Sequence, residues 1–210
     1  MSNLFIIQMP TALIFFCAAI VIASIRSQGL RGIVLLLTPI LALFQIYQLG
    51  LGEFYSTSLF QMNMELMRVD KLSRVFGVIF CIAAFLGNLY AWHVRDKVQQ
   101  VATLLYTGSA IGAVFAGDFL SLFFYWEGTA IASVFLIWAR CTQASFHTGM
   151  RYLIVQIGSG VVLLAGLALR YHETGSLEFG LLELSSLSSW LIFFAFGIKC
   201  AFPLLHNWLQ

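Results

Sequence analysis

The chain has 210 residues, of which 60% are hydrophobic and only 10% are charged, and its mean hydropathy is +0.92. A soluble domain carries about 25% charged residues, so this composition excludes an ordinary water-soluble protein and predicts an all-α membrane protein. The formal net charge of +2 excludes a strong long-range field that would gather nucleic acid or an acidic substrate.

Seven charge-poor windows have the length of a membrane helix, because a bilayer core of ~30 Å needs about 20 apolar residues per helix. They cover residues 4–25, 32–51, 75–92, 98–117, 119–139, 152–169 and 184–209. The first window has no Lys or Arg before it and is too long for a signal peptide, so it is interpreted as a retained helix. Residues 52–70 form the one substantial connection and have the pattern of a short hairpin. No linker divides residues 1–210, which we treat as one transmembrane domain.

Basic residues are distributed unequally between the two sets of loops. Six (Arg26, Arg31, Arg95, Lys97, Arg140, Arg151) belong to the first, third and fifth connections, and four (Arg68, Lys71, Arg74, Arg170) belong to the others. Because cytoplasmic loops carry the excess of Lys and Arg, this bias favours a multi-pass protein of the cell's inner (plasma) membrane with its N-terminus outside.

Two windows contain a charged residue near mid-membrane. At 1.5 Å per residue, Glu127 lies roughly 13 Å and Lys199 roughly 17 Å from the same membrane face. An isolated charge at the bilayer centre costs at least ~2.5 kcal/mol, so an acid and a base at one depth favour a shared site. A static ion pair that orients two helices is the alternative.

Two residues after Lys199 support a functional interpretation. Pro203 has no N–H and leaves the Lys199 carbonyl without its helical partner, and broken helices with ionisable groups are frequent in transporters. An ordinary proline kink is the alternative. His206 lies on the same helical face two turns later and could accept a proton, although an interfacial histidine is also compatible with that position.

Other polar groups are less informative. Tyr106, Thr107, Ser109, Gln156 and Ser159 could hold water beside the charged pair, or could be packing contacts between helices. The cysteines (Cys17, Cys81, Cys141, Cys200) form no CxxC pair and are interpreted as small hydrophobes. No GxGxxG, Walker loop or HExxH occurs, so no cofactor and no metal site is predicted, and any redox chemistry is expected in partner subunits.

Four segments resemble one family of membrane proteins: VDKLSRVF, DFLSLFFYWEGTAIAS, MRYLIVQIGSG and GIKCAFPLLHNWL. They are similar to the antiporter-like subunits shared by respiratory complex I, Mrp-type sodium/proton antiporters and membrane-bound hydrogenases. The resemblance maps the family's glutamate and lysine pair onto Glu127 and Lys199, and its His-x-Trp-Leu element onto His206, Trp208 and Leu209. Pro203 and Gln210 depart from the common pattern, which suggests a branch closer to the Mrp type.

The resemblance also implies an architecture. Members have about fourteen helices with two inverted repeats, and this chain corresponds to the N-terminal half, ending inside the first repeat. A fragment of a longer protein and a split subunit both remain compatible with the sequence. The partners implied are other membrane subunits of a multisubunit antiporter or complex I-like assembly, with the lipid bilayer, protons and Na+ but no nucleic acid.

These observations lead to a hypothesis of proton translocation, or sodium/proton antiport, in which Lys199 relays protons, Glu127 tunes its proton affinity and His206 accepts protons. The chain by itself would not be an enzyme, and an NADH:quinone oxidoreductase-like complex is one assembly that it would fit. A non-conducting scaffold subunit is the main alternative. A haem-bearing subunit that uses His93, His147 or His172 is a weaker one, because haem ligation needs histidines at matching depth.

The predicted orientation can be tested with single cysteines at Gln28 and Thr57 in a variant without the native cysteines. A membrane-impermeant maleimide added to intact cells should label position 57 but reach position 28 only after permeabilisation. The opposite labelling pattern would show that the N-terminus lies inside.

Overall fold

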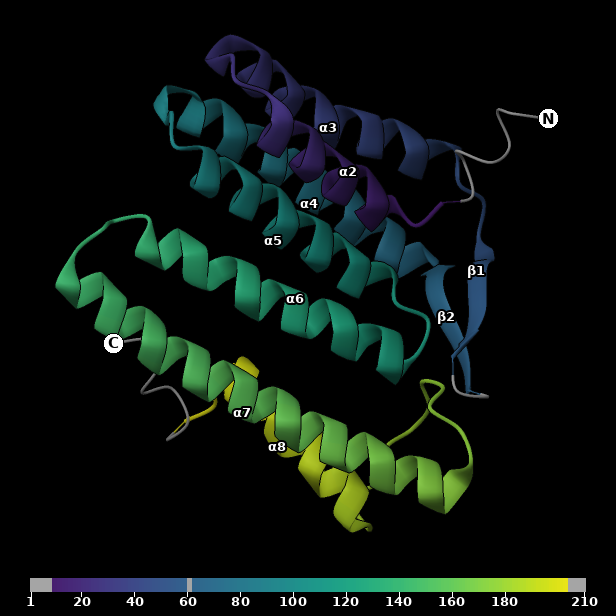
Figure 1. Ribbon diagram of the computed structural model, residues 1–210. Coiled ribbons are helices and arrows are strands. Elements are labelled where there is room, and N and C mark those ends of the chain that lie inside the picture. Colours follow the sequence, from purple (N-terminus) through teal and green to yellow (C-terminus); the bar gives the residue numbers. More distant parts are fainter. Residues whose placement is uncertain (1–8, 60–61, 204–210) are drawn as a thin grey trace.

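A bundle of antiparallel helices forms most of the chain (Figure 1). The computed structural model describes residues 9–59 and 62–203. Within them lie seven α-helices and one two-stranded sheet. In chain order the elements are α2 (Thr11–Ser24), α3 (Gln28–Gln48), β1 (Gly52–Leu59), β2 (Met62–Val69), α4 (Lys71–Tyr90), the 3-10 turn η1 (Ala91–His93), α5 (Lys97–Phe115), α6 (Phe119–Trp138), α7 (Gln143–Thr174) and α8 (Leu187–Lys199).

The all-α membrane fold expected from composition is confirmed. Five helical segments are long and apolar enough to cross a bilayer: α3, α4 with η1, α5, α6 and α7, while α2 and α8 are shorter apolar helices. Helix α4 buries only 17% of its most apolar window within the chain. Its many exposed aliphatic and aromatic side chains therefore need lipid or another subunit as a neighbour.

The helices form two groups that α6 connects. Helices α2, α3, α4 and α5 pack together on one side of α6, and α7 with α8 lies on the other (Figure 1). Helices α5 and α6 approach closely because Gly112 leaves room for the ring of Tyr125. Small residues play this role in membrane proteins, where lipid competes for apolar contacts and close packing must hold helices together.

Two helix boundaries differ most from those expected. The sixth window, residues 152–169, corresponds to α7 at Gln143–Thr174, because a capping box between Thr142 and Ser145 starts the helix well before the apolar stretch. The expectation of a helix over 184–209 is wrong in its described part, since α8 ends at Lys199. Residues 4–8 of the first window and 204–209 of the last lie outside the described residues.

The hairpin suggested by residues 52–70 forms at one end of the bundle, with β1 antiparallel to β2 and Tyr55 opposite Met67. It is anchored to α6 through Asp118, a buried carboxylate that accepts hydrogen bonds from the N–H groups of Glu65 and Ser121. The N–H of Phe119 donates to the Leu177 carbonyl at 3.0 Å. The hairpin, the start of α6 and the connection after α7 are therefore fixed to one another.

Helix α4 begins directly after the hairpin at a reciprocal capping box. The Asp70 carboxylate accepts a hydrogen bond from the Ser73 N–H at 2.7 Å, and the Ser73 hydroxyl accepts one from the Asp70 N–H at 2.9 Å. The bond from the Ser73 N–H, which favours the ionised carboxylate, holds the pKa of Asp70 below its ordinary value of 3.8.

We predict that Asp70→Ala lowers the free energy of unfolding by ~1 kcal/mol at neutral pH, the usual value of an N-cap. Because the folded-state pKa is lowered, the cap's full contribution is present above the ordinary pKa of 3.8 and disappears as the pH falls through the lowered value. Asp70→Asn caps a helix without titrating. Thermal unfolding in detergent should therefore show the wild type losing stability relative to Asp70→Asn in acid; a pH-independent difference would contradict this.

Candidate functional site

Helix α8 stops inside the apolar part of the chain. Its 13 residues span about 20 Å, less than the ~30 Å bilayer core. The stop is a Schellman motif: the Phe202 N–H donates to the Gly197 carbonyl at 2.9 Å, and the Ala201 N–H donates to the Ile198 carbonyl at 3.1 Å. Ala201 has a φ of 53°, a left-handed conformation that usually belongs to glycine.

Pro203 reinforces this interruption. In a continuous helix the N–H of residue 203 would bond to the carbonyl of Lys199, but proline has no N–H to donate. The Lys199 carbonyl thus lacks its helical hydrogen bond at the negative end of the helix dipole. Lys199, the final residue of α8, places its positive charge at that end, where a cation is favourable.

The Lys199 ammonium is bound by helix α6. Its Nζ donates to the Trp126 carbonyl at 3.1 Å and to the Thr129 hydroxyl at 3.3 Å. It also lies 4.8 Å from the centre of the Trp126 ring, within the range of a cation–π interaction. The partners of the ammonium are therefore electrically neutral, and α6 provides all of them in the described residues.

Glu127, the next residue on α6, faces helix α7. Its carboxyl group lies against Gly160, where a Cβ atom would overlap with Oε1. The same Oε1 is buried and has no hydrogen-bond partner in the part of the chain that the structure describes. Glycine at position 160 is thus what allows a carboxyl group to enter the interface between α6 and α7.

Lys199 is bound to the two residues of α6 that flank Glu127 in the same helix turn, but the described residues contain no direct ion pair between Glu127 and Lys199. Both side chains are partly buried. The Glu127 side chain faces α7, and the Lys199 side chain reaches the same turn of α6 from α8.

The other predicted residues separate into two groups. Gln156 and Ser159 are buried on α7 beside Gly160, and the Ser159 hydroxyl donates to the Ala195 carbonyl of α8 at 3.1 Å. Ser109, on α5, is buried against α6 near Gly128. Tyr106 and Thr107 instead line a separate cavity between α4 and α5, away from the charged residues.

The predicted histidine relay lies beyond the described residues, because His206 falls in the segment 204–210. Trp208, Leu209 and Gln210 lie there too. His93, His147 and His172 are exposed at helix ends.

Sequence reasoning missed Trp126, Thr129 and Gly160. The first two occupy positions i and i+3 of one helix turn, a spacing that brings the Trp126 carbonyl and the Thr129 hydroxyl together at 2.7 Å. All three residues are uncharged, so a hydropathy profile does not single them out. Their proximity to Glu127 in the chain or, for Gly160, in space is the only feature that distinguishes them.

The chain is similar to several known membrane proteins. Residues 116–210 match the family described as NADH:quinone oxidoreductase/Mrp antiporter, TM. A putative antiporter subunit mnhA2 from Staphylococcus saprophyticus is 28% identical over 172 residues, which are 74% of this chain and 21% of that protein. Hydrogenase-4 component B of Escherichia coli is 27% identical over 157 residues, 68% of this chain and 23% of that protein. The chain therefore spans about a fifth to a quarter of the length of these relatives.

Solved structures show the same fold. A chain of the archaeal membrane-bound sulfane sulfur reductase superposes with a TM-score of 0.82 at 22% identity, covering 96% of this chain and 35% of that one. A chain of respiratory complex I from Thermus thermophilus superposes with a TM-score of 0.78 at 21% identity, covering 95% of this chain and 45% of that one.

We predict that Gly160→Ala destabilises the protein by ~1 kcal/mol, because the added methyl group overlaps with the Glu127 carboxyl and forces that side chain out of its preferred rotamer. Gly158→Ala is the matched control, since no heavy atom lies within 4 Å of the Cβ position there. That control should be neutral or slightly stabilising, as alanine favours helices over glycine. Equal thermal stability of both variants in detergent would contradict the assigned contact.

Proposed function

We propose that this chain, a relative of the antiporter-like membrane subunits of complex I and Mrp assemblies, translocates protons or exchanges sodium for protons. It would work as one membrane subunit of such an assembly, in the inner (plasma) membrane and with its N-terminus outside. Lys199 is the proton relay, and Glu127 tunes its proton affinity. His206 would receive protons from Lys199 on the path that follows α8.

The observation that carries the proposal is the position of Lys199 at an interrupted helix end, bound to neutral oxygen atoms of α6 beside an acid. A carboxylate in direct contact would hold the ammonium in its charged state. The Trp126 carbonyl and the Thr129 hydroxyl bind it at 3.1 and 3.3 Å without adding a negative charge. Such a site can retain the side chain in both protonation states.

Thr129 suits this role because a hydroxyl both donates and accepts. It accepts from the Lys199 ammonium at 3.3 Å, and it donates to the Trp126 carbonyl at 2.7 Å. If Lys199 gives up a proton, the resulting amine has a lone pair to which the same hydroxyl can donate after rotating. The amine therefore need not be left with an unpaired polar atom in the apolar bundle.

Glu127 acts through its distance from Lys199. Two opposite charges 4 Å apart attract by ~4 kcal/mol at an effective dielectric constant near 20, and the attraction weakens as they separate. A small rotation of α6 against α7 and α8 would change that distance and with it the proton affinity of Lys199. Because the Glu127 Oε1 has no hydrogen-bond partner in the described residues, the carboxyl group can change its position against Gly160 without breaking a hydrogen bond at that atom.

We predict that Lys199→Ala and Glu127→Ala each abolish most proton transport by the assembled protein, and that Lys199→Arg also fails. Arginine keeps the positive charge, but with a pKa above ~12 it does not release its proton. Proton flux should be measured in vesicles on the same preparations whose folded fraction is determined in detergent. Lys71→Arg, at an exposed position outside the site, is the matched control and should transport normally.

A static or scaffold role gives a different pattern. A structural cation at position 199 should tolerate arginine, since charge and hydrogen-bond donors are retained. Either alanine variant should then lose folded protein, because a charge would remain without its counterpart at mid-membrane. Normal transport by Lys199→Arg, or losses of flux that only follow losses of folded protein, would exclude the relay.

A further inference from the structure

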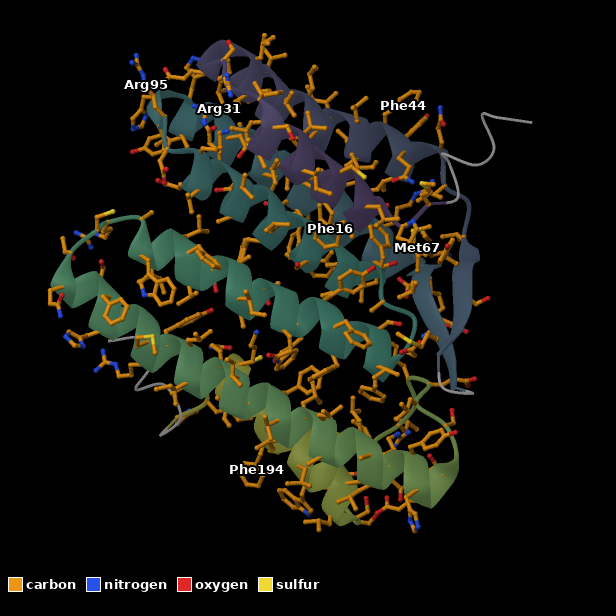
Figure 2. All side chains as sticks on the ribbon, viewed as in Figure 1. Phe16, Arg31, Phe44, Met67, Arg95 and Phe194 are labelled. Atoms are coloured by element: carbon orange, nitrogen blue, oxygen red, sulfur yellow. The ribbon has the colours of Figure 1, made fainter. Side chains whose placement is uncertain are left out.

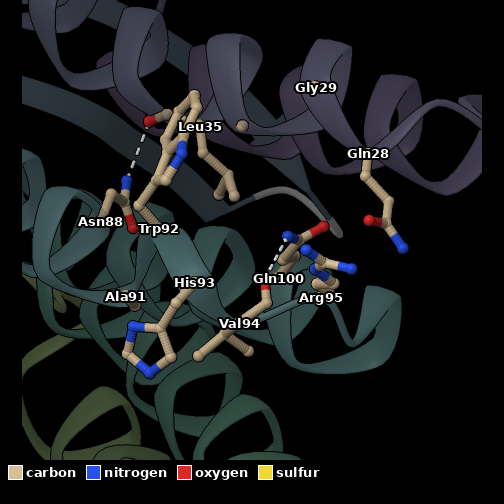
Figure 3. A pocket seen from close by; sticks show the side chains of 11 residues that line it. Gln28, Gly29, Leu35, Asn88, Ala91, Trp92, His93, Val94, Arg95 and Gln100 are labelled. Carbon is tan, nitrogen blue, oxygen red and sulfur yellow. Dashed lines mark hydrogen bonds between the residues drawn. The ribbon is translucent and has the colours of Figure 1, made fainter.

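A polar cavity of about 410 Å³ lies at the end of the bundle opposite the hairpin. Figure 3 shows the side chains that line it. It is formed by the first residues of α3, including Gln28 and Gly29, and by the turn between α4 and α5, including Trp92 and Arg95. The charged residues of the proposed proton path do not line it. Its place at a helix end, beside residues rich in positive charge, is that of a membrane–water interface.

Two arginines make this cavity electropositive. Arg95 lines it, and Arg31 lies beside it with Nη2 donating to the Arg95 carbonyl at 3.2 Å (Figure 2). Arg31 is only 4% exposed, its Nε has no hydrogen-bond partner, and it forms no ion pair with a carboxylate in the described part of the chain. A guanidinium so deeply buried requires an anion or other acceptors to offset its lost hydration.

The neighbouring charged residues do not supply the anion that the Arg31 guanidinium needs. The nearest acidic side chain in sequence is Asp96, whose carboxylate already accepts from the N–H groups of Val98 and Gln99 at the start of α5. Lys97 adds a further positive charge and donates to the Ala23 carbonyl at 2.8 Å. Helix α3 begins at the cavity with no side chain capping its N–H groups, which add positive potential.

The cavity also contains a buried hydrogen-bond acceptor. Gln100 lines it and is 8% exposed; its amide nitrogen donates to the Val94 carbonyl at 2.9 Å, which fixes the orientation of the amide. The remaining amide oxygen has no partner in the described residues. An occupant with both an anionic group and a hydroxyl donor would therefore suit the two lining residues Arg95 and Gln100, and its charge would offset that of Arg31 beside the cavity.

An apolar groove of about 450 Å³ adjoins the cavity on the side of α4 and α5. Asn88 and Ala91 line both spaces, so the two lie next to each other at these residues. The groove runs past Phe80, Ala84 and Gly87 on α4, which buries the smallest share of its apolar window among the five long membrane helices. A polar cavity beside an apolar groove suits an amphiphile.

We propose that this is a binding site for an anionic phospholipid, with its phosphate at Arg95 and the start of α3, beside the buried Arg31, and an acyl chain in the groove between α4 and α5. A headgroup with hydroxyl groups, as in phosphatidylglycerol, would donate to the Gln100 amide oxygen. The lipid would neutralise the buried guanidinium and cover the exposed face of α4. Free inorganic phosphate shares the anionic chemistry but has no chain for the groove.

The glycines of the site provide sharp tests. At Gly29, which lines the cavity, and at Gly87, which lines the groove, no heavy atom lies within 4 Å of an added Cβ. Gly29→Glu therefore adds a negative charge to the headgroup site, and Gly87→Leu fills the groove, without a clash at Cβ. Gly158→Leu is the control, because it is an equally open helical glycine far from both spaces. Arg95→Gln, at an exposed side chain, is a second headgroup variant in case Gly29→Glu misfolds.

Native mass spectrometry of the protein purified from its own membranes, titrated with dioleoyl phosphatidylglycerol, measures the binding. Wild type and Gly158→Leu should bind one lipid tightly, and Gly29→Glu, Arg95→Gln and Gly87→Leu should each bind about tenfold more weakly, as expected for losing one charge-assisted bond or a chain contact. Inorganic phosphate at millimolar concentration should not displace the lipid. Unchanged binding by all three variants would overturn the proposal. If phosphate displaces the lipid and Gly87→Leu has no effect, the lipid proposal is wrong and the cavity is a site for a free anion.

Discussion

The hydrogen bond from the Lys199 ammonium to the Trp126 carbonyl is the contact on which the proposed site depends. A charge within an apolar bundle needs partners supplied by the protein, because lipid provides none. Helix α6 supplies them through its backbone, the Thr129 hydroxyl and the Trp126 ring. Helix α8 packs mainly against α7, so Lys199 and the Trp126–Phe196 ring contact are what join its last turns to α6.

The surrounding packing makes that contact compatible with a nearby acid. Gly160 allows the Glu127 carboxyl to lie between α6 and α7, while Lys199 approaches α6 from α8. The described residues contain no direct ion pair between the two. At the hairpin end, Asp118 fixes the start of α6 by its bonds to Ser121 and Glu65. Helix α6 is held at that end, and the charged residues lie about two turns further along it.

Hydropathy alone was sufficient to predict the helical membrane fold and to select the two charged residues, because an ionisable group in an apolar window is costly wherever it lies. It could not determine side-chain partners, which depend on how α6 is rotated about its axis. It also placed the start of α7 too late, since a capping box at Thr142 extends a helix without apolar residues. The end of α8 was hidden because alanine, at Ala201, occupies a left-handed position where glycine would have been the signal.

The same reasoning explains why Arg31 escaped notice as a site residue. In the sequence it counted only as one of the loop charges that orient the protein, and such residues are normally hydrated. In the fold it is buried beneath the turn between α4 and α5, bonded to a backbone carbonyl. A basic residue at a membrane interface can thus serve topology and ligand binding together, and only its burial separates the two roles.

The central claim, that Lys199 gains and loses a proton during transport, can be tested most directly by the 15N chemical shift of its side-chain nitrogen. The signal would be assigned by its absence in Lys199→Arg and recorded on the assembled protein with the driving reaction running and stopped. If Lys199 relays protons, both its ammonium form and its neutral amine form are populated during turnover. An ammonium signal that stays unchanged while protons are being transported would contradict it.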